Sequence, residues 1–120
     1  MSIHVQARGF ELTESLERHV HKRINADLGH RLDDISSLRV GLSDINGPRG
    51  GADKCCRVHI GLPRQPDLVI NDVQADMYNA IDSALRRARR ALRRRLSRLR
   101  AGARRRIGWS GITAGTAGGV

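Results

Sequence analysis

The feature that most constrains the fold is an amphipathic, arginine-rich stretch over residues 76–100. Apolar side chains recur there at steps of three and four residues, which places them on one stripe of a helix. The stripe consists of Met77, Ile81, Ala84, Leu85, Ala88, Leu92, Leu96 and Leu99. No proline or glycine interrupts the stretch before Gly102. We therefore predict one long helix whose apolar stripe packs on another layer of the protein.

Positive charge is concentrated on this helix and on the residues that follow it. Of the 22 Lys and Arg, ten lie in residues 1–85, together with all 12 Asp and Glu. The other twelve are arginines between Arg86 and Arg106, where no acid occurs. Solvated helix faces usually mix both signs, because like charges at i and i+4 repel each other. The segregation favours a surface that binds an extended polyanion such as nucleic acid over one that only keeps the chain soluble.

The remainder of the chain predicts four strands and a second helix. Alternation of apolar and polar side chains and short apolar runs indicate the strands. We expect them over residues 2–7, 35–45, 55–62 and 68–73. Thr13 is a good N-cap for a helix over residues 14–28, and Gly29 suits its C-terminal end. The glycine-rich segment 46–54 is expected to be a turn or a mobile loop between two strands.

The element order is therefore β-α-β-β-β-α, which predicts an α+β fold. A right-handed crossover makes the first two strands parallel neighbours, and short connections make the last three strands antiparallel. Each strand has one apolar face and each helix one apolar stripe. We therefore expect a two-layer sandwich, with a four-stranded sheet and two helices on one face. The folded domain is expected to span residues 1–101, followed by a disordered tail of glycines and arginines over 102–120.

Catalytic and metal-binding patterns are weak in this sequence. The five histidines are scattered without a metal-ligand spacing, and the adjacent Cys55 and Cys56 form no C-x-x-C motif. Cys56 is expected to be a small core residue rather than a nucleophile. We expect no enzyme activity, no metal and no cofactor. No apolar run is long enough to span a membrane, and the N-terminus lacks a signal pattern, so a cytoplasmic protein is expected.

Two motifs resemble a known family. The pattern I-x-V-x-A-R-G-F-E-L-T-E-S-L begins at Ile3, and D-M-Y-N-A-I-D occupies Asp76–Asp82. Together with the element order, they are similar to the short ribosome hibernation-promoting factors, also called ribosome-associated inhibitor A proteins. The resemblance implies a stationary-phase stress factor that is monomeric off the ribosome. It would sit in the mRNA and tRNA channel of the small subunit, contact ribosomal RNA through two basic helices and block translation.

The candidate RNA-binding residues lie on the two predicted helices. They are Arg18, Lys22, Arg23, Tyr78, Arg86, Arg87, Arg89, Arg90, Arg93 and Arg94. The resemblance matches Tyr78 to the family's tyrosine, while the residues themselves leave it open whether Tyr78 closes the core or stacks on a base. Two other functions remain as alternatives. One is general RNA binding without ribosome specificity, and the other is docking of the basic helix on a protein partner or an anionic membrane.

Overall fold

The structure, a computed structural model, describes residues 2–45 and 53–110, with side chains described as far as residue 102. It confirms the predicted order of strands and helices. The elements are β1 (Ser2–Arg8), α1 (Glu14–Leu28), the short 3-10 helix η1 (Gly29–Asp34), β2 (Ser37–Asp44), β3 (Lys54–Leu62), β4 (Gln65–Gln74) and α2 (Met77–Ser110).

The four strands form one sheet in the order β1-β2-β3-β4. β1 and β2 are parallel, with Val5 opposite Val40, and β3 is antiparallel to both β2 and β4. In the same register Val58 lies opposite both Val40 and Ile70. The predicted α+β topology, including the crossover through α1, is therefore correct.

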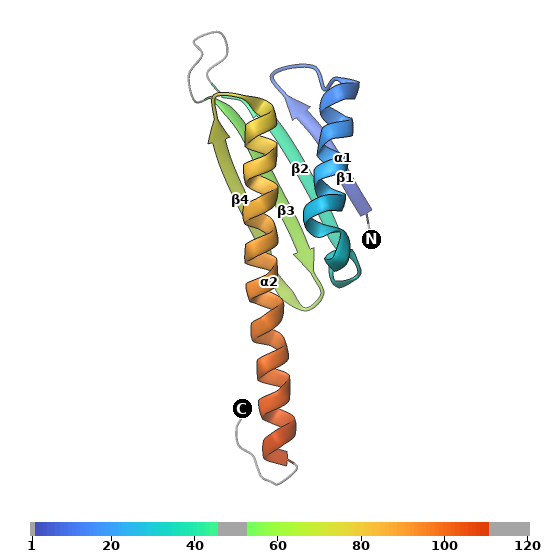
Figure 1. Ribbon diagram of the computed structural model, residues 1–120, viewed down its shortest axis with the longest axis vertical. Coiled ribbons are helices and arrows are strands. Elements are labelled where there is room, and N and C mark those ends of the chain that lie inside the picture. Colours follow the sequence, from blue (N-terminus) through green and yellow to red (C-terminus); the bar gives the residue numbers. More distant parts are fainter. Residues whose placement is uncertain (1, 46–52, 111–120) are drawn as a thin grey trace. The chain divides into compact units, whose positions relative to one another are not determined.

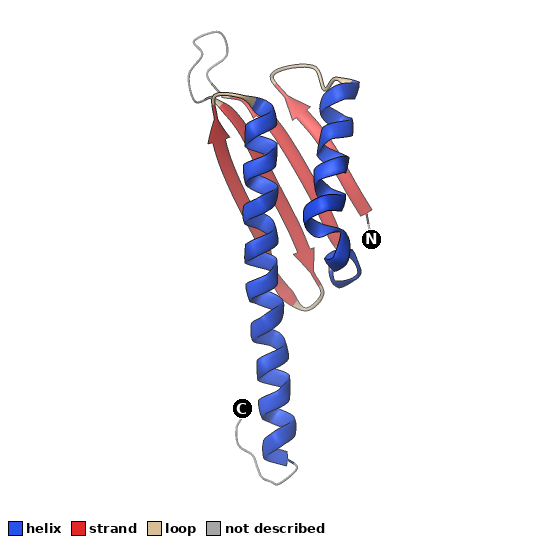
Figure 2. Cartoon of the chain, viewed as in Figure 1, coloured by secondary structure: helices blue, strands red, loops and turns tan. Residues whose placement is uncertain are grey.

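The chain divides into two compact units, residues 1–89 and residues 90–120. In the first unit, α1 and the first turns of α2 lie side by side on one face of the sheet (Figures 1 and 2). This arrangement is the predicted two-layer sandwich. It follows from the sequence because every element in the unit has a single apolar face to bury.

Aliphatic side chains from the two central strands and both helices build the core of the first unit. Alternate residues of β2 and β3 face the helices, and residues at steps of three and four on each helix face the sheet. The fully buried large side chains among them are Val20, Ile24, Leu28, Leu38, Val40, Leu42, Val58, Ile60, Ile81 and Leu85. Thr13 accepts a hydrogen bond from the Leu16 amide at 3.2 Å, which confirms it as the N-cap of α1.

Two predicted boundaries are wrong. α2 does not end before Gly102 but continues to Ser110. One internal glycine costs about 1 kcal/mol relative to alanine, and the alanines and arginines around it favour a helix. β4 begins at Gln65 rather than at residue 68, because Pro66 is tolerated in an edge strand.

Three further predictions concern the end of α1, the glycine-rich loop and the C-terminal tail. Gly29 is the C-cap of α1, as predicted, and its N–H donates to the Asn25 carbonyl oxygen. Its conformation is right-handed rather than left-handed, and the chain continues from it into η1. Most of the expected glycine loop, residues 46–52, lies outside the described residues, and so does the end of the expected tail, residues 111–120. The proposed limit of the folded domain at residue 101 stays a prediction.

Candidate nucleic-acid interface

The cations of α1 differ in how far carboxylates neutralise them. Arg18 donates to Glu14 at 3.1 Å, and both side chains are largely exposed, so this pair is weak. Lys22 is exposed, and no ion pair joins it to a described residue. Arg23 is different, because its side chain is only 29% exposed and it pairs with a carboxylate on each helix. Of the three predicted α1 cations, Lys22 is therefore the most available to a partner.

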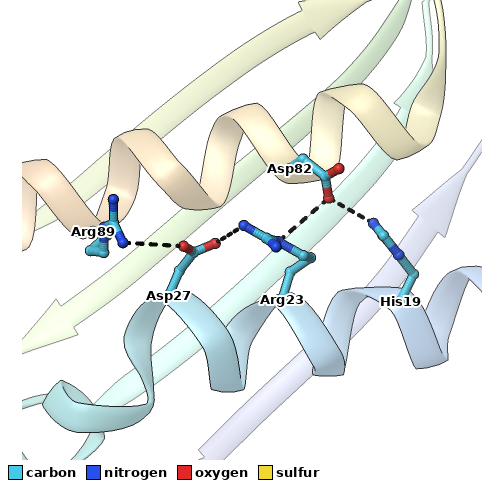
Figure 3. A network of polar contacts seen from close by, with 5 residues as sticks. All are labelled: His19, Arg23, Asp27, Asp82 and Arg89. Atoms are coloured by element: carbon cyan, nitrogen blue, oxygen red, sulfur yellow. Dashed lines mark hydrogen bonds and ion pairs between the residues drawn. The ribbon is translucent and has the colours of Figure 1, made fainter.

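A row of alternating charges joins α1 to α2 (Figure 3). Arg23 donates to Asp27 at 2.9 Å, and its Nε lies 3.5 Å from Asp82 on α2. Asp82 is also 2.7 Å from His19 Nε2, and Asp27 is 3.8 Å from Arg89. The Asp27 side chain is only 5% exposed, and a buried carboxylate is costly unless it is paired. Arg23 and Arg89 therefore stabilise the contact between the two helices.

Tyr78 lies at the start of α2 beside this row. Its ring meets the His19 ring edge-on, with the ring centroids 4.9 Å apart and the planes at 76°. Tyr78 is nevertheless 39% exposed. The side chain is thus outside the core and positioned by His19, and part of its ring is free to contact a base.

Arg86 and Arg87 are adjacent in sequence but differ in their contacts. Arg87 donates to the Asp72 carboxylate at 3.1 Å and to the Asn71 carbonyl oxygen at 2.7 Å. Arg86 is exposed, and no described carboxylate pairs with it. Asp82, one turn before Arg86, is already engaged by His19 and Arg23. Arg86 therefore presents an unneutralised charge, whereas Arg87 is bound to the sheet.

The carboxylate that binds Arg87 is itself buried. Asp72 faces the helices from β4 and is 6% exposed. Burial disfavours its charged form, but hydrogen bonds from Ser83, Gln74 and Arg87 outweigh that effect and lower the pKa of the Asp72 carboxyl. Asp72 therefore stays ionised at neutral pH and fixes the first turns of α2 on the edge strand.

The second unit contains the next predicted cations of α2. Arg90, Arg93 and Arg94 are all exposed, and no ion pair joins them to a described residue. No acidic residue follows Asp82 in the sequence, so neutralisation from within this part of the helix is impossible. Arg93 and Arg94 follow Arg90 by one turn, so the three arginines present charge on two successive turns of the helix.

The nine predicted cations thus fall into two groups. Arg23, Arg87 and Arg89 are held by buried carboxylates, and Arg18 has an exposed partner. We call the five without a described carboxylate partner the unpaired cations: Lys22, Arg86, Arg90, Arg93 and Arg94. The sequence patterns did not reveal Asp27 and Asp72 as partners of these arginines. Only Asp27 has a sequence signal, because it lies four residues after Arg23.

The described residues give little support for a catalytic cysteine, a metal site or a membrane span. Cys56 is fully buried in the core, as predicted, and burial raises the pKa of its thiol to about 12. No group of three or more His, Cys, Asp or Glu in the described ranges is placed to hold a metal ion. None of the helices, over the part of the chain that is described, is long and apolar enough to cross a membrane.

Comparison with known proteins adds a family and two similar folds. Residues 3–100 match the family described as sigma 54 modulation protein / S30EA ribosomal protein. The N-terminal domain of Protein Y from Thermus thermophilus is 26% identical, with a TM-score of 0.63, and the match covers 78% of this chain and 98% of that one. A ribosomal subunit interface protein from Coxiella burnetii shares the fold at 20% identity and a TM-score of 0.66, covering 81% and 99%.

No curated protein matches the chain. The family match nevertheless extends from β1 to residue 100 of α2 and so includes every element described above. It also agrees with the resemblance that the two sequence motifs indicated. The chain therefore belongs to the sigma 54 modulation protein / S30EA ribosomal protein family.

Proposed function

We propose that this protein binds the small ribosomal subunit through the cations of α1 and α2 and inhibits translation by occupying the mRNA and tRNA channel. Membership of a family described as a ribosomal protein supports ribosome association, and a similar fold occurs in a ribosomal subunit interface protein. The observation that carries the proposal is the set of unpaired cations, of which four are exposed arginines on one helix.

The mechanism follows from the charges. Each guanidinium that reaches an RNA phosphate releases counterions, so binding is strong and depends on salt. Tyr78 adds a partly exposed ring that can stack on an unpaired base. Arg23, Arg87 and Arg89 hold α1 and the first turns of α2 in place, so the part of the binding surface in the first unit is pre-organised. A basic surface of this kind competes with mRNA and tRNA for the same phosphates, without a cofactor or a small-molecule substrate.

The proposed role is that of a cytoplasmic hibernation or stress factor, and its association with the ribosome can be tested in cells. Lysate from starved cells is sedimented on a sucrose gradient, and each fraction is probed for the protein. We expect it in the small-subunit and whole-ribosome fractions. A protein that stays at the top of the gradient, or spreads over all RNA-containing fractions, would instead support the protein-docking or general RNA-binding alternative.

Inhibition by occupancy can be tested in a purified translation system. An inhibitor that blocks a channel acts stoichiometrically, so the concentration for half-inhibition should follow the ribosome concentration when binding is tight. Translation should recover when the protein is washed away with salt. Inhibition by a small fraction of an equivalent that persists after washing would indicate chemical alteration of ribosomes and would exclude the occupancy mechanism.

A further inference from the structure

The outer face of the sheet, opposite the helices, is a second basic surface. Outward residues alternate with core residues along each strand, and on three strands they include an exposed arginine: Arg8 on β1, Arg39 on β2 and Arg57 on β3. The register places Arg57 opposite Gly41, two residues from Arg39 on the neighbouring strand. Such diagonal neighbours are about 8 Å apart at their backbones. The three guanidiniums can therefore be reached by one extended ligand.

Among the described residues, no carboxylate neutralises these arginines. None of the three forms an ion pair with a described residue. The outward acidic residue of β4, Asp67, is already bonded to His59 at 2.6 Å. The face therefore has the same property as the unpaired cations of α2, namely exposed guanidinium groups without a described counter-charge.

A hollow lies at the centre of this face. Gly41 has no side chain, and a Cβ built there would meet no atom within 4 Å. The resulting depression has a volume of about 410 Å³, and its polar lining includes Gln6, Arg8, Arg39, Arg57, His59 and Asn71. Guanidinium and amide donors converge on this space, which suits phosphate oxygens.

The chemistry of the lining favours one kind of ligand. A peptide partner is normally anchored by apolar or aromatic side chains in a dry pocket. The hollow is instead open and lined mainly by donors from all four strands, so it suits a polyanion that lies across the strands. We propose that the outer face of the sheet is a second RNA-binding surface, which binds the phosphate backbone of an RNA segment other than the one held by the helices.

The inference rests on the proposed function for the RNA segment that the helices bind. The RNA segment on the outer face is inferred from the residues of the sheet alone. It implies that one protein molecule holds two RNA strands, one on each layer. The test is the stoichiometry of binding to a short single-stranded RNA oligonucleotide, measured by calorimetry and sedimentation at low salt. We expect two oligonucleotides per wild-type protein, with both sites weakened by salt.

Gly41 allows a matched pair of variants. Gly41→Glu places a carboxylate in the hollow, opposite Arg57, whereas Gly41→Gln adds the same bulk without charge. Both should fold, because a Cβ at this position meets no atom within 4 Å and the hollow leaves room for the longer side chain. Gly41→Glu should reduce the stoichiometry from two to one, and Gly41→Gln should keep two. Arg39→Gln and Arg57→Gln should each weaken the second site by about tenfold.

The outcomes separate this inference from the proposed function. Replacing Arg86, Arg90 and Arg93 by Gln should remove the first oligonucleotide and leave the second. If those changes have no effect but Gly41→Glu still removes one oligonucleotide, the sheet surface stands and the helix proposal fails. One oligonucleotide per wild-type protein at saturation would overturn the sheet surface. So would equal binding by the two Gly41 variants, or binding of a polyglutamate peptide, but of no RNA, at the hollow.

Discussion

The arginines that lie against carboxylates and those that do not make an instructive comparison. Arg23, Arg87 and Arg89 each contact a carboxylate that is no more than 6% exposed, so their charge is used to hold helix to helix or helix to sheet. The unpaired cations face solvent with no described partner and produce the positive potential. Basic residues on one helix therefore have different roles. A count of all of them overestimates how many are available to bind RNA.

The largest expected effect concerns Arg23 and its neighbour Lys22. Arg23→Gln leaves the buried Asp27 carboxylate with only Arg89 at 3.8 Å, so the free energy of unfolding should fall by about 3 kcal/mol. Lys22→Gln should change it by less than about 0.5 kcal/mol and should weaken RNA binding instead. Urea titrations of both variants measure the difference. Equal stability of the two variants would break the distinction between paired and unpaired cations on α1.

The second comparison uses the adjacent residues of α2. Arg87→Gln removes a charged hydrogen bond from buried Asp72 and should lower the free energy of unfolding by about 1.5 kcal/mol. Arg86→Gln removes the same charge but should leave stability unchanged and reduce affinity for small subunits. Thermal melts and binding assays on the two proteins provide the check. If Arg87→Gln weakens binding while leaving the melt unchanged, the assignment of the two residues is reversed.

A smaller effect concerns pH. The folded-state pKa of Asp72 is lowered, so its ionised form adds stability that is present above its unfolded pKa of about 3.9. That stability is lost as the pH falls through the lower folded-state pKa. The difference in unfolding free energy between wild type and Asp72→Asn should thus be greatest near neutral pH and shrink below about pH 4. A difference that stays constant down to pH 2 would mean that the Asp72 charge contributes nothing.

Sequence patterns predicted the fold well because every element of the first unit has one apolar face. The stripe of α2 from Met77 to Leu92 and the alternation in β2 and β3 correspond to buried residues. The end of the predicted stripe does not, because Leu96 is half-buried and Leu99 is 39% exposed. The end of α2 was missed because a glycine is only a weak helix breaker amid alanine and arginine. Local propensity sets such boundaries, whereas burial sets the topology.

Sequence patterns predicted the candidate site less completely. They identify exposed arginines by helical spacing, but they do not show that Asp72 of β4 faces Arg87 or that Asp82 of α2 faces Arg23. Those partners are distant in the chain and come together only when the sheet and helices pack. The basic outer face was missed for the same reason, because Arg8, Arg39 and Arg57 lie on three separate strands.

The central claim is that the unpaired arginines of α2 contact RNA of the small subunit. Its most direct test is the affinity for purified small subunits, measured between 50 and 200 mM salt. If about six phosphates are neutralised, wild-type affinity should fall roughly a thousandfold over that range. A variant with Arg86→Gln and Arg93→Gln is compared with one carrying Arg31→Gln and Arg64→Gln, which loses the same charge elsewhere.

We expect the Arg86 and Arg93 variant to bind more weakly and to show a slope of log affinity against log salt that is smaller by roughly 1.5. The Arg31 and Arg64 variant should keep nearly the wild-type slope, because neither residue lies on the proposed surface. Equal slopes for the two variants, or a flat salt response of the wild-type protein, would contradict the account and show that the arginine-rich helix does not bind RNA phosphates.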